Sequence, residues 1–537
     1  GRSNARGRPG KERLEEAGMN SMKKLEELKF DNLVLKELPI DPEKRNFTRQ
    51  VSGACFSIVD PTPIEEPELV AASNDALAII HVDPKEIERK DFPAIFCGNE
   101  ILKGARPAAH CYCGHQFGYF SGQLGDGATM FLGQIVNDDG RHWEIQYKGA
   151  GKTPYSRSAD GRKVLRSSIR EFLCSEAMAG LGIPTTRAPS IVTSRKSKVI
   201  RDIFYDGNTK DEQCTVITRL APTFLRFGSF EIVKPMDPIT NREGPSAKRA
   251  DILEALLTHT IQRYFPKIWK KHEESKEKED MYLDFYIEVV TRTASLVALW
   301  QAVGWCHGVL NTDNMSIIGL TIDYGPYGFM EKTDPDYACN DSDNEGRYSY
   351  KNQPAMCKFN CEKLAEALQL LLPLSKSKKA LEDIWDKIYE ESYYENMGRK
   401  LGLNQSNEKS ARDLIDSLLE TMSETSADFS LTFRTMSEYV RNINKDPEIY
   451  HKTFLEGFSK KVLATQDEIK ESLKISMPIQ QLQMIVMMAR QQPALLNRFP
   501  QVLGDLKKLQ KIKSFQETPE EKRLEAAIES WKEWLVR

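Results

Sequence analysis

The chain has 537 residues, and its 75 basic side chains nearly balance 78 acidic ones to give a net charge of −3. No stretch approaches the roughly 18–20 apolar residues that span a bilayer, so the sequence predicts no transmembrane segment. It also lacks the basic excess that usually accompanies a nucleic-acid partner. The length predicts two or three subdomains of a globular protein.

Ten cysteines are dispersed along the chain, too sparsely for a disulfide framework, which favours a reducing compartment. Cys111, Cys113 and His115 could suggest zinc, but no second pair lies at the spacing of a zinc finger. Buried packing thiols are the favoured interpretation there and at Cys357 and Cys361.

Residues 1–28 are polar and mixed in charge, which predicts a disordered leader without the apolar stretch of a secretory signal. Residues 29–110 contain several prolines that break the chain into short pieces. We interpret this second range as an N-terminal extension that wraps around the lobe that follows.

Residues 122–128 are rich in glycine and precede two expected strands at 129–132 and 143–148, with Gly140 at the turn. Glycine lets backbone N–H groups approach phosphate, so the hairpin is similar to the one that covers the phosphates in a kinase small lobe. An ordinary hairpin would explain the same pattern. Lys148 ends the second strand, where a kinase keeps its phosphate-binding lysine, although a solvated lysine is the alternative.

Apolar residues at helical spacing predict a helix that begins near Leu165 and stops at residues 180–184. Glu171 lies just beside the apolar stripe and resembles the kinase glutamate that pairs with the lysine, here Lys148. Glu176 is the rival candidate. Such a pair matters because a free lysine has about 2 kcal/mol of rotamer entropy to lose.

A charged turn at 153–162 is followed by a β-branched strand that carries Arg219, and Arg226 comes seven residues later. Arginine forks match pairs of phosphate oxygens, so these side chains could join Lys148 as cations for a phosphate group. Further along, apolar stripes near 252–264, 285–300, 381–389 and 414–422 predict a helical second half, and another helix closes the chain.

The loop from His307 to Ser316 is polar and is followed by an apolar run that ends at Asp323. Because Mg²⁺ prefers hard oxygen ligands, we expect Asn314 and Asp323 to bind it, with Asp313 placed to accept a proton. The alternative without a function is that these residues only form turns.

Protein kinases carry a His-Arg-Asp base, a metal-binding Asn five residues later and a downstream Asp-Phe-Gly. In this chain His307-Gly308-Val309 stands at the first motif, so the usual base is missing. Asn314 falls five residues after Val309, and Asp323-Tyr324-Gly325 takes the place of the last motif.

This loop, together with Thr321–Pro326, closely resembles selenoprotein O, a kinase-like family of protein adenylyltransferases, and the resemblance extends from about Gly53 to Leu535. It implies an α+β, two-lobed protein-kinase-like fold with an N-terminal extension and extra C-terminal helices. The expected ranges are a leader at 1–28, an extension at 29–110, a small lobe at 111–235, a large lobe with the catalytic loop at 236–440 and a helical extension at 441–537.

The resemblance implies that ATP binds in the reverse sense, with its γ-phosphate buried and its α-phosphate near the acceptor. The implied nucleotide-binding residues are Gly125, Gly127, Ala128, Lys148, Asp160, Gly161, Glu171, Arg219 and Arg226. Asn314 and Asp323 would hold Mg²⁺ or Mn²⁺, and Asp313 would be the base.

The expected reaction is transfer of AMP from ATP to Ser, Thr or Tyr hydroxyls of protein substrates, including the enzyme itself. An ordinary kinase and a catalytically silent nucleotide-binding pseudokinase scaffold are the alternatives. The resemblance also implies a mitochondrial location. Family members usually continue further, some to a selenocysteine, whereas this chain stops at Arg537, so we assign it no selenocysteine chemistry.

Overall fold

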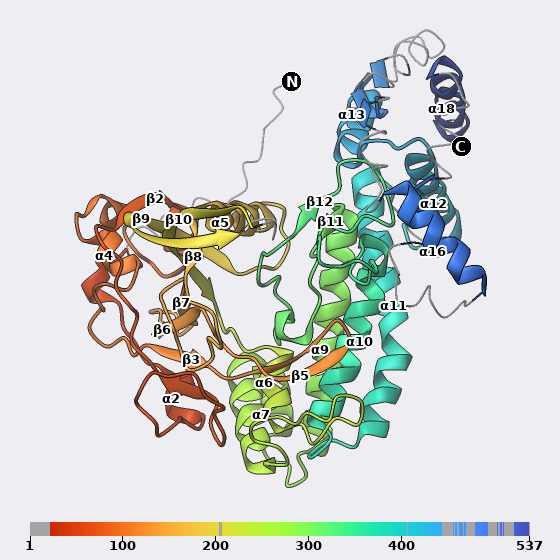
Figure 1. Ribbon diagram of the computed structural model, residues 1–537. Helices are drawn as coiled ribbons and strands as arrows, with labels where there is room; N and C mark the ends of the chain where they lie inside the picture. The colour runs from red at the N-terminus through yellow and green to blue at the C-terminus, as the bar shows by residue number, and fades with distance from the viewer. Residues whose placement is uncertain are drawn as a thin grey trace, which may run out of the picture. The chain divides into compact units, whose positions relative to one another are not determined.

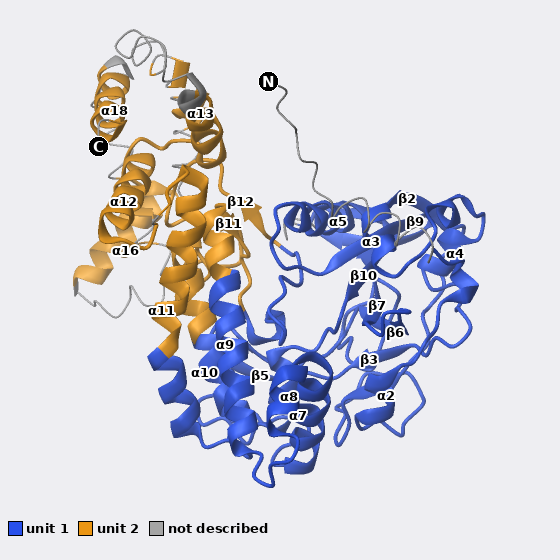
Figure 2. Cartoon of the chain, turned by 180° about the vertical axis from the view of Figure 1, so that it is seen from behind, with its two compact units in different colours: residues 1–296, 311–325, 359–383 blue, residues 297–310, 326–358, 384–537 orange. Residues whose placement is uncertain are grey.

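The computed structural model describes residues 22–202, 207–404, 406–442, 478–491 and 520–535, and shorter pieces between residues 455 and 509. Packing divides the chain into two units, which Figure 2 colours separately. Unit 1 contains residues 1–296, 311–325 and 359–383, and unit 2 contains residues 297–310, 326–358 and 384–537. The five ranges expected from the sequence stay a prediction, since this division follows packing and cuts through the expected large lobe.

The main sheet of unit 1 has eight antiparallel strands in the described part of the chain (Figure 1). Its order is β1 (Phe56–Ile58), β3 (Ala108–His110), β6 (Thr129–Val136), β7 (His142–Lys148), β10 (Thr209–Ala221), β9 (Arg187–Asp202) and β2 (Glu68–Ala72), and β8 (Lys163–Val164) pairs with β10. The hairpin expected around Gly140 is confirmed as β6 and β7, with Thr129 opposite Lys148. Both strands extend further than the sequence pattern indicated.

Helix α5 (Leu165–Gly180) is the helix that the sequence predicted after this hairpin. Its apolar side chains Leu165, Ile169 and Phe172 pack on a cluster formed by β9 and β10, namely Ala188, Ile191 and Ile217. Because these contacts fix the apolar stripe against the sheet, the polar side chains beside the stripe are aimed along the sheet surface.

The N-terminal extension is an integral part of the sheet and not only a wrap around it. Its strands β1 and β2 form the two edges of the main sheet. Within the expected leader, residues 1–21 lie outside the described residues, but residues 22–28 are folded, with Leu25 only 1% exposed. The polar composition of this stretch predicted disorder, because composition does not reveal that Leu25 and Leu28 are buried by distant parts of the chain.

Further helices of unit 1 are short near the N-terminus and longer after the sheet. They are α2 (Leu33–Glu37), α3 (Asn74–Ile79), α4 (Phe92–Phe96), α6 (Phe227–Phe230), α7 (Ala250–Tyr264) and α8 (Pro266–His272), with a separate hairpin of β4 (Cys113–Gln116) and β5 (Tyr119–Gln123). The long helices α9 (Glu279–Ala302), α10 (Gln353–Leu368) and α11 (Leu374–Leu401) contribute residues to both units. The mixed architecture confirms the predicted α+β class.

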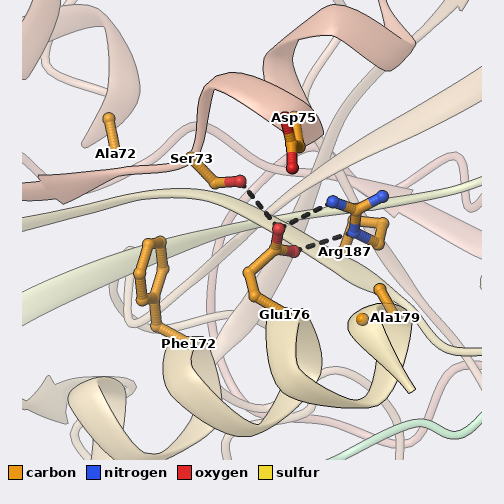
Figure 3. A pocket seen from close by; sticks show the side chains of 8 residues that line it. Ala72, Ser73, Asp75, Phe172, Glu176, Ala179 and Arg187 are labelled. Carbon is orange, nitrogen blue, oxygen red and sulfur yellow. Dashed lines mark hydrogen bonds and ion pairs between the residues drawn. The ribbon is translucent and has the colours of Figure 1, made fainter.

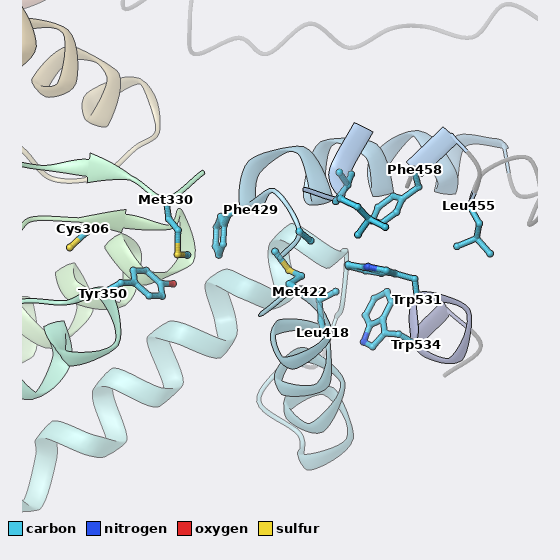
Figure 4. Packing of buried hydrophobic residues seen from close by; sticks show 13 residues of the cluster. Cys306, Met330, Tyr350, Leu418, Met422, Phe429, Leu455, Phe458, Trp531 and Trp534 are labelled. Carbon is cyan, nitrogen blue, oxygen red and sulfur yellow. The ribbon is translucent and has the colours of Figure 1, made fainter. Parts of the chain in front are cut away.

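Unit 2 is mainly helical. It contains β11 (Trp305–Cys306), β12 (Gly328–Phe329), α12 (Lys409–Glu424), α13 (Phe429–Asn442), α16 (Ile479–Gln491) and α18 (Glu520–Leu535). Trp531 and Trp534 of α18 pack with Leu418 and Met422 of α12 in one apolar cluster (Figure 4). Both indole N–H groups are hydrogen-bonded, to Thr425 Oγ1 and the Leu414 carbonyl oxygen, so the tryptophans are buried without an unpaired donor. Among the described residues, no helix is both long and apolar enough to cross a bilayer.

Candidate active site

Asp323 lies at the centre of a charged cluster in unit 1. The apolar run before it is not a strand in the described structure, which forms isolated bridges there. Thr321 pairs with Thr185, and Ser316 pairs with Arg226. These bridges fix the segment at both ends, so the acid is still carried on a backbone that is held in place.

The backbone of Asp323 is in the left-handed region, with φ of +63°. Aspartate is one of the few residues other than glycine that adopts this conformation without a large penalty. Its carboxylate is contacted by three cations: Lys148 Nζ at 3.2 Å, Arg219 Nη1, and Arg226 Nη1. Side chains that are separated by up to 175 positions in the sequence therefore meet at one carboxylate.

Glu171 is the second carboxylate of this cluster. Lys148 Nζ lies 2.8 Å from Glu171 Oε2, so the expected ion pair is present, and Arg219 Nη1 lies 3.2 Å from Glu171 Oε1. Arg219 Nη2 also donates to Gln146 Oε1 at 2.7 Å. The guanidinium of Arg219 is thus held in one orientation by a strand residue, a helix residue and the Asp323 carboxylate.

The rival candidate, Glu176, faces a different place. It pairs with Arg187 Nη2 at 2.7 Å and accepts from the Ser73 hydroxyl at the same distance, in a cavity of about 460 Å³ (Figure 3). Phe172 and Asp75 also line this cavity. The two glutamates of α5 are therefore separated by the geometry of the helix, and the one beside Lys148 is Glu171.

Arg226 is buried, and its guanidinium is surrounded by π and acidic groups. It lies 4.6 Å from the ring centroid of Tyr112, donates to the Asp313 carbonyl oxygen at 2.7 Å, and approaches Asp126 at 4.0 Å. In the part of the chain that the structure describes, the buried Nε–H groups of Arg219 and Arg226 have no acceptor. Unsatisfied buried donors are costly, and they commonly mark a site that a ligand completes.

The charges of the cluster shift each other's proton affinity. Burial acts to raise the pKa of Asp323, but Arg226, Lys148 and Arg219 hold that pKa well below its ordinary value. Repulsion from Lys148, together with burial, lowers the pKa of Lys163 to about 8. The cluster therefore contains an ionised acid and a fourth basic group, Lys163, that the sequence pattern did not single out.

Asp313 occupies a short 3₁₀ turn (η4, Thr312–Asn314) with Asn314 next to it. It is 9% exposed, and Gln116 Nε2 donates to its Oδ2 at 3.4 Å. Its Oδ1 is buried and has no hydrogen-bond partner among the described residues. Burial raises the pKa of Asp313 to about 7, against the opposing charge of Arg226, which is a suitable proton affinity for a general base near neutrality.

The glycine-rich loop before β6 is packed against Tyr155. A Cβ on Gly125 would lie 2.4 Å from the Tyr155 ring, and one on Gly127 would lie 2.9 Å from its carbonyl oxygen. The Ala128 carbonyl accepts from Gly149 N–H at 2.6 Å. The absence of side chains at the two glycines therefore makes room for Tyr155, and the expectation that this loop binds phosphate stays a prediction.

Asp160 and Gly161 follow this loop in the chain. Their contacts in the structure are with residues outside the cluster around Asp323. Asp160 forms an ion pair with Arg201 at 2.6 Å, and the Gly161 carbonyl accepts from Gly151 N–H at 3.0 Å. Their expected contact with nucleotide stays a prediction.

Cys111 and Cys113 are buried, and burial raises the pKa of the Cys111 thiol to about 12. The ring of His115 is hydrogen-bonded to the Glu231 carboxylate through Nδ1.

Comparison with known proteins gives the family of this chain. The family model described as "Protein adenylyltransferase SelO" matches residues 44–523. "Protein adenylyltransferase SelO-1, mitochondrial" of Danio rerio is 46% identical over 98% of this chain and 78% of its own length. The human "Protein adenylyltransferase SelO, mitochondrial" is 47% identical over 95% of this chain and 76% of its own length.

The chain belongs to the SelO family. A bacterial relative, "Protein nucleotidyltransferase YdiU" of Rhodopirellula baltica, is 42% identical over 78% of this chain and 76% of its own length. Membership confirms the resemblance drawn from the catalytic loop and makes the chain a nucleotidyltransferase, with ATP as the co-substrate that adenylyl transfer requires. The animal relatives are named mitochondrial and the bacterial one is not.

The oxygen donors of this SelO-family site fit a hard divalent cation. Asp313 Oδ1 is an unpartnered buried carboxylate oxygen within the described structure, and the Asp323 carboxylate is contacted by Lys148, Arg219 and Arg226. The described residues include no cluster of three or more His, Cys, Asp or Glu side chains at metal-binding spacing. The expected ligands, the Asn314 amide and the Asp323 carboxylate, stay a prediction; such a pair would suit Mg²⁺, which takes further ligands from phosphate and water.

Sequence reasoning missed four side chains that support this site: Gln116, Asp126, Gln146 and Lys163. Gln146 could have been found from the sequence, because residues two positions apart on a strand share a face and Gln146 precedes Lys148 by two positions on β7. Asp126 had a weaker one, as an acid placed between two glycines. Gln116 and Lys163 reach the site only through tertiary packing, which no local pattern encodes.

Proposed function

We propose that this enzyme transfers AMP from ATP to a Ser, Thr or Tyr hydroxyl of a protein and releases pyrophosphate. The observation that carries the proposal is the convergence of Lys148, Arg219 and Arg226 on Asp323. In the structure the carboxylates of Glu171 and Asp323 are the counter-ions of these cations. A triphosphate would take their place, because charge-assisted bonds from arginine to phosphate are strong and can be bidentate.

The depth of the two arginines supports a reversed nucleotide. Arg219 and Arg226 are each 2% exposed, so whatever they bind lies at the bottom of the site. The β- and γ-phosphates carry most of the charge of ATP and are the groups that these cations favour. That arrangement leaves the α-phosphate on the outer side, where a protein hydroxyl can reach it.

In the proposed reaction the acceptor oxygen attacks the α-phosphorus, and the bond from that phosphorus to the oxygen bridging to the β-phosphate breaks. Its electron pair leaves with pyrophosphate, and the hydroxyl proton goes to Asp313. Asp313 is chosen because Val309 occupies the position of the kinase base, and because its buried carboxylate has a pKa of about 7. Asn314 and Asp323 would hold Mg²⁺, which spreads the charge that develops on phosphorus.

The decisive experiment uses ATP labelled at either the α- or the γ-phosphate with the same protein acceptor. We expect label from the α-position to enter the protein and label from the γ-position to leave as pyrophosphate. Label from the γ-position in the protein would establish an ordinary kinase. Stabilisation by nucleotide without any labelled product would establish a silent scaffold.

Two finer proposals concern acceptors and location. The enzyme modifies its own hydroxyls, which a mass increase of one AMP on peptides of the purified protein would reveal after incubation with ATP and Mg²⁺. It acts in mitochondria, as the names of its animal relatives suggest. A tagged full-length protein that stays outside mitochondria in fractionated cells would contradict the second proposal.

A further inference from the structure

The hairpin of β4 and β5 has an unusual turn. Gln116 pairs with Tyr119, which leaves Phe117 and Gly118 as the two turn residues, with φ of +50° and +87°. Turns of this kind favour Asn-Gly, because both residues must adopt the left-handed region. A phenylalanine there is a steric outlier, and strained residues of this sort gather at functional sites.

The same turn exposes aromatic surface to solvent. Phe117 is 40% exposed and Tyr119 is 62% exposed. Both residues therefore keep surface that a partner can cover. Exposed aromatic side chains are typical of surfaces that bind a partner, where they supply contact area at a low cost in conformational entropy.

This aromatic turn is attached directly to the loop that carries the proposed base. His115 N–H donates to Thr312 Oγ1 at 2.7 Å, and Phe117 N–H donates to Asn311 Oδ1 at 3.4 Å. Between them, Gln116 Nε2 contacts Asp313 Oδ2 at 3.4 Å. The strand is therefore held along residues 311–313, and Phe117 and Tyr119 belong to the turn at the end of that contact.

A neighbouring loop adds apolar surface on the β5 side. Arg242 Nη1 donates to the Ser121 carbonyl oxygen at 3.5 Å, so residues 234–244 lie against β5. This loop exposes Met236 by 59% and Ile239 by 73%. The segment that contacts β5 thus also carries exposed apolar side chains.

We propose that Phe117 and Tyr119 bind the polypeptide segment that presents the acceptor hydroxyl, by contact with an apolar side chain close to that hydroxyl. The inference rests on the proposed function, since it assumes that Asp313 receives the acceptor proton. A polypeptide is favoured over the nucleotide phosphates because these two side chains carry no positive charge, whereas the cations of the site gather around Asp323. The aromatic turn is thus a specificity-determining surface for the protein substrate.

Phe117→Asn and Tyr119→Ala test this surface. Asparagine suits the left-handed turn position, so Phe117→Asn removes the aromatic ring without threatening the fold. Phe47→Ala is the matched control, because Phe47 is an aromatic of unit 1 with 47% exposure that packs against Arg45 and Arg49. Each purified full-length variant is assayed with α-labelled ATP, Mg²⁺ and dephosphorylated casein as the protein acceptor.

Three quantities are measured: KM for casein, KM for ATP, and the slow release of AMP when water is the acceptor. We expect each turn variant to raise KM for casein about tenfold, the effect of losing one aromatic contact, while the other two quantities stay within twofold. Phe47→Ala should change none of them. An unchanged KM for casein overturns the inference, and so does a raised KM for ATP, which would mean that the aromatics stack on adenine.

Loss of the role of the aromatic turn and loss of the proposed function give different results. If wild-type enzyme labels casein but the variants behave like wild type, only the role of the aromatic turn is lost. If wild-type enzyme transfers no α-label to casein and releases no AMP, the proposed function and this inference are both overturned. Impairment of all three quantities to a similar degree would show that the turn only supports the fold, which would overturn the inference.

Discussion

Helix α5 carries two glutamates, five positions apart, whose surroundings differ in a way that separates structure from function. Glu176 is saturated: its Oε1 accepts from Arg187 Nε and Ala188 N–H, and its Oε2 accepts from Arg187 Nη2 and Ser73. Every lone pair that faces the protein is used. Nothing about this ion pair requires a further partner, although it lines a cavity (Figure 3).

Glu171 belongs to a cluster of charged side chains whose hydrogen bonding is incomplete. It shares Lys148 and Arg219 with Asp323, and within the described structure the Nε–H groups of Arg219 and Arg226 lack acceptors. Buried charges normally need both a partner and complete hydrogen bonding. The comparison teaches that an ion pair built for stability satisfies itself, whereas one built for a ligand retains donors that the ligand must satisfy.

The largest effect is expected for Asp323→Asn. This change removes the carboxylate on which three cations converge and one of the proposed metal ligands, so adenylyl transfer should fall about 10³-fold. It also leaves buried cations without a counter-ion, which should lower the free energy of unfolding by about 3 kcal/mol. Initial rates with α-labelled ATP and denaturant unfolding curves measure the two effects, and a variant with normal turnover would remove Asp323 from the site.

Arg226→Lys should have the next largest effect. Lysine keeps the charge but loses the planar fork, and one charge-assisted hydrogen bond is worth about 2 kcal/mol, or roughly 30-fold in kcat/KM for ATP. The thermal stabilisation produced by ATP should fall in parallel. Equal ATP stabilisation in both proteins would show that Arg226 contacts only groups of the protein and not the nucleotide.

Glu171→Gln is expected to lower kcat/KM for ATP by only about tenfold. The amide loses the charge that holds Lys148, but Asp323 still lies 3.2 Å from the ammonium and keeps part of its orientation. Steady-state kinetics at several ATP concentrations provide the measurement. A loss as large as that of Asp323→Asn would mean that Glu171 itself contacts the reacting groups.

Glu176→Gln is the counterpart on the same helix and should leave turnover within twofold of wild type. It should instead lower the free energy of unfolding by about 2 kcal/mol, because the charged hydrogen bonds to Arg187 are lost. Side-by-side kinetics and unfolding of the two Gln variants complete the comparison. If Glu176→Gln impaired turnover more than Glu171→Gln, the assignment of the two glutamates would be reversed.

The stability contributed by Glu176 should also depend on pH. Burial acts to raise its pKa, but Arg187, the Ala188 N–H and Ser73 lower that pKa below its ordinary value of 4.5. Because the folded-state pKa is depressed, this contribution is complete above pH 4.5 and is lost as the pH falls through the lower folded value. Acid unfolding of wild type should therefore be steeper below pH 4.5 than that of Glu176→Gln.

Local patterns predicted the parts of the site that local geometry determines. Alternation along β7 placed Lys148 at the strand end, and the apolar stripe of α5 left Glu171 and Glu176 as candidates beside the sheet. The pairing of Lys148 with Glu171 was expected from the resemblance to kinases, and the structure decides between the two glutamates. Gln116 could not be found in this way, because it reaches Asp313 across 197 positions of sequence. Asp126, between two glycines, gave only a weak signal, because it approaches Arg226 from 100 positions away. The edge strands β1 and β2 escaped prediction for the same reason: both are short and pair with distant partners.

Those edge strands have a consequence for how the protein is made. Since β2 pairs with β9, the early strand leaves the ribosome long before its partner and must wait in an unpaired state. A recombinant form that began after Ala72 would lack both border strands. It would present the backbone N–H and C=O groups of β3 and β9 to solvent, and such open borders recruit other chains into insoluble aggregates.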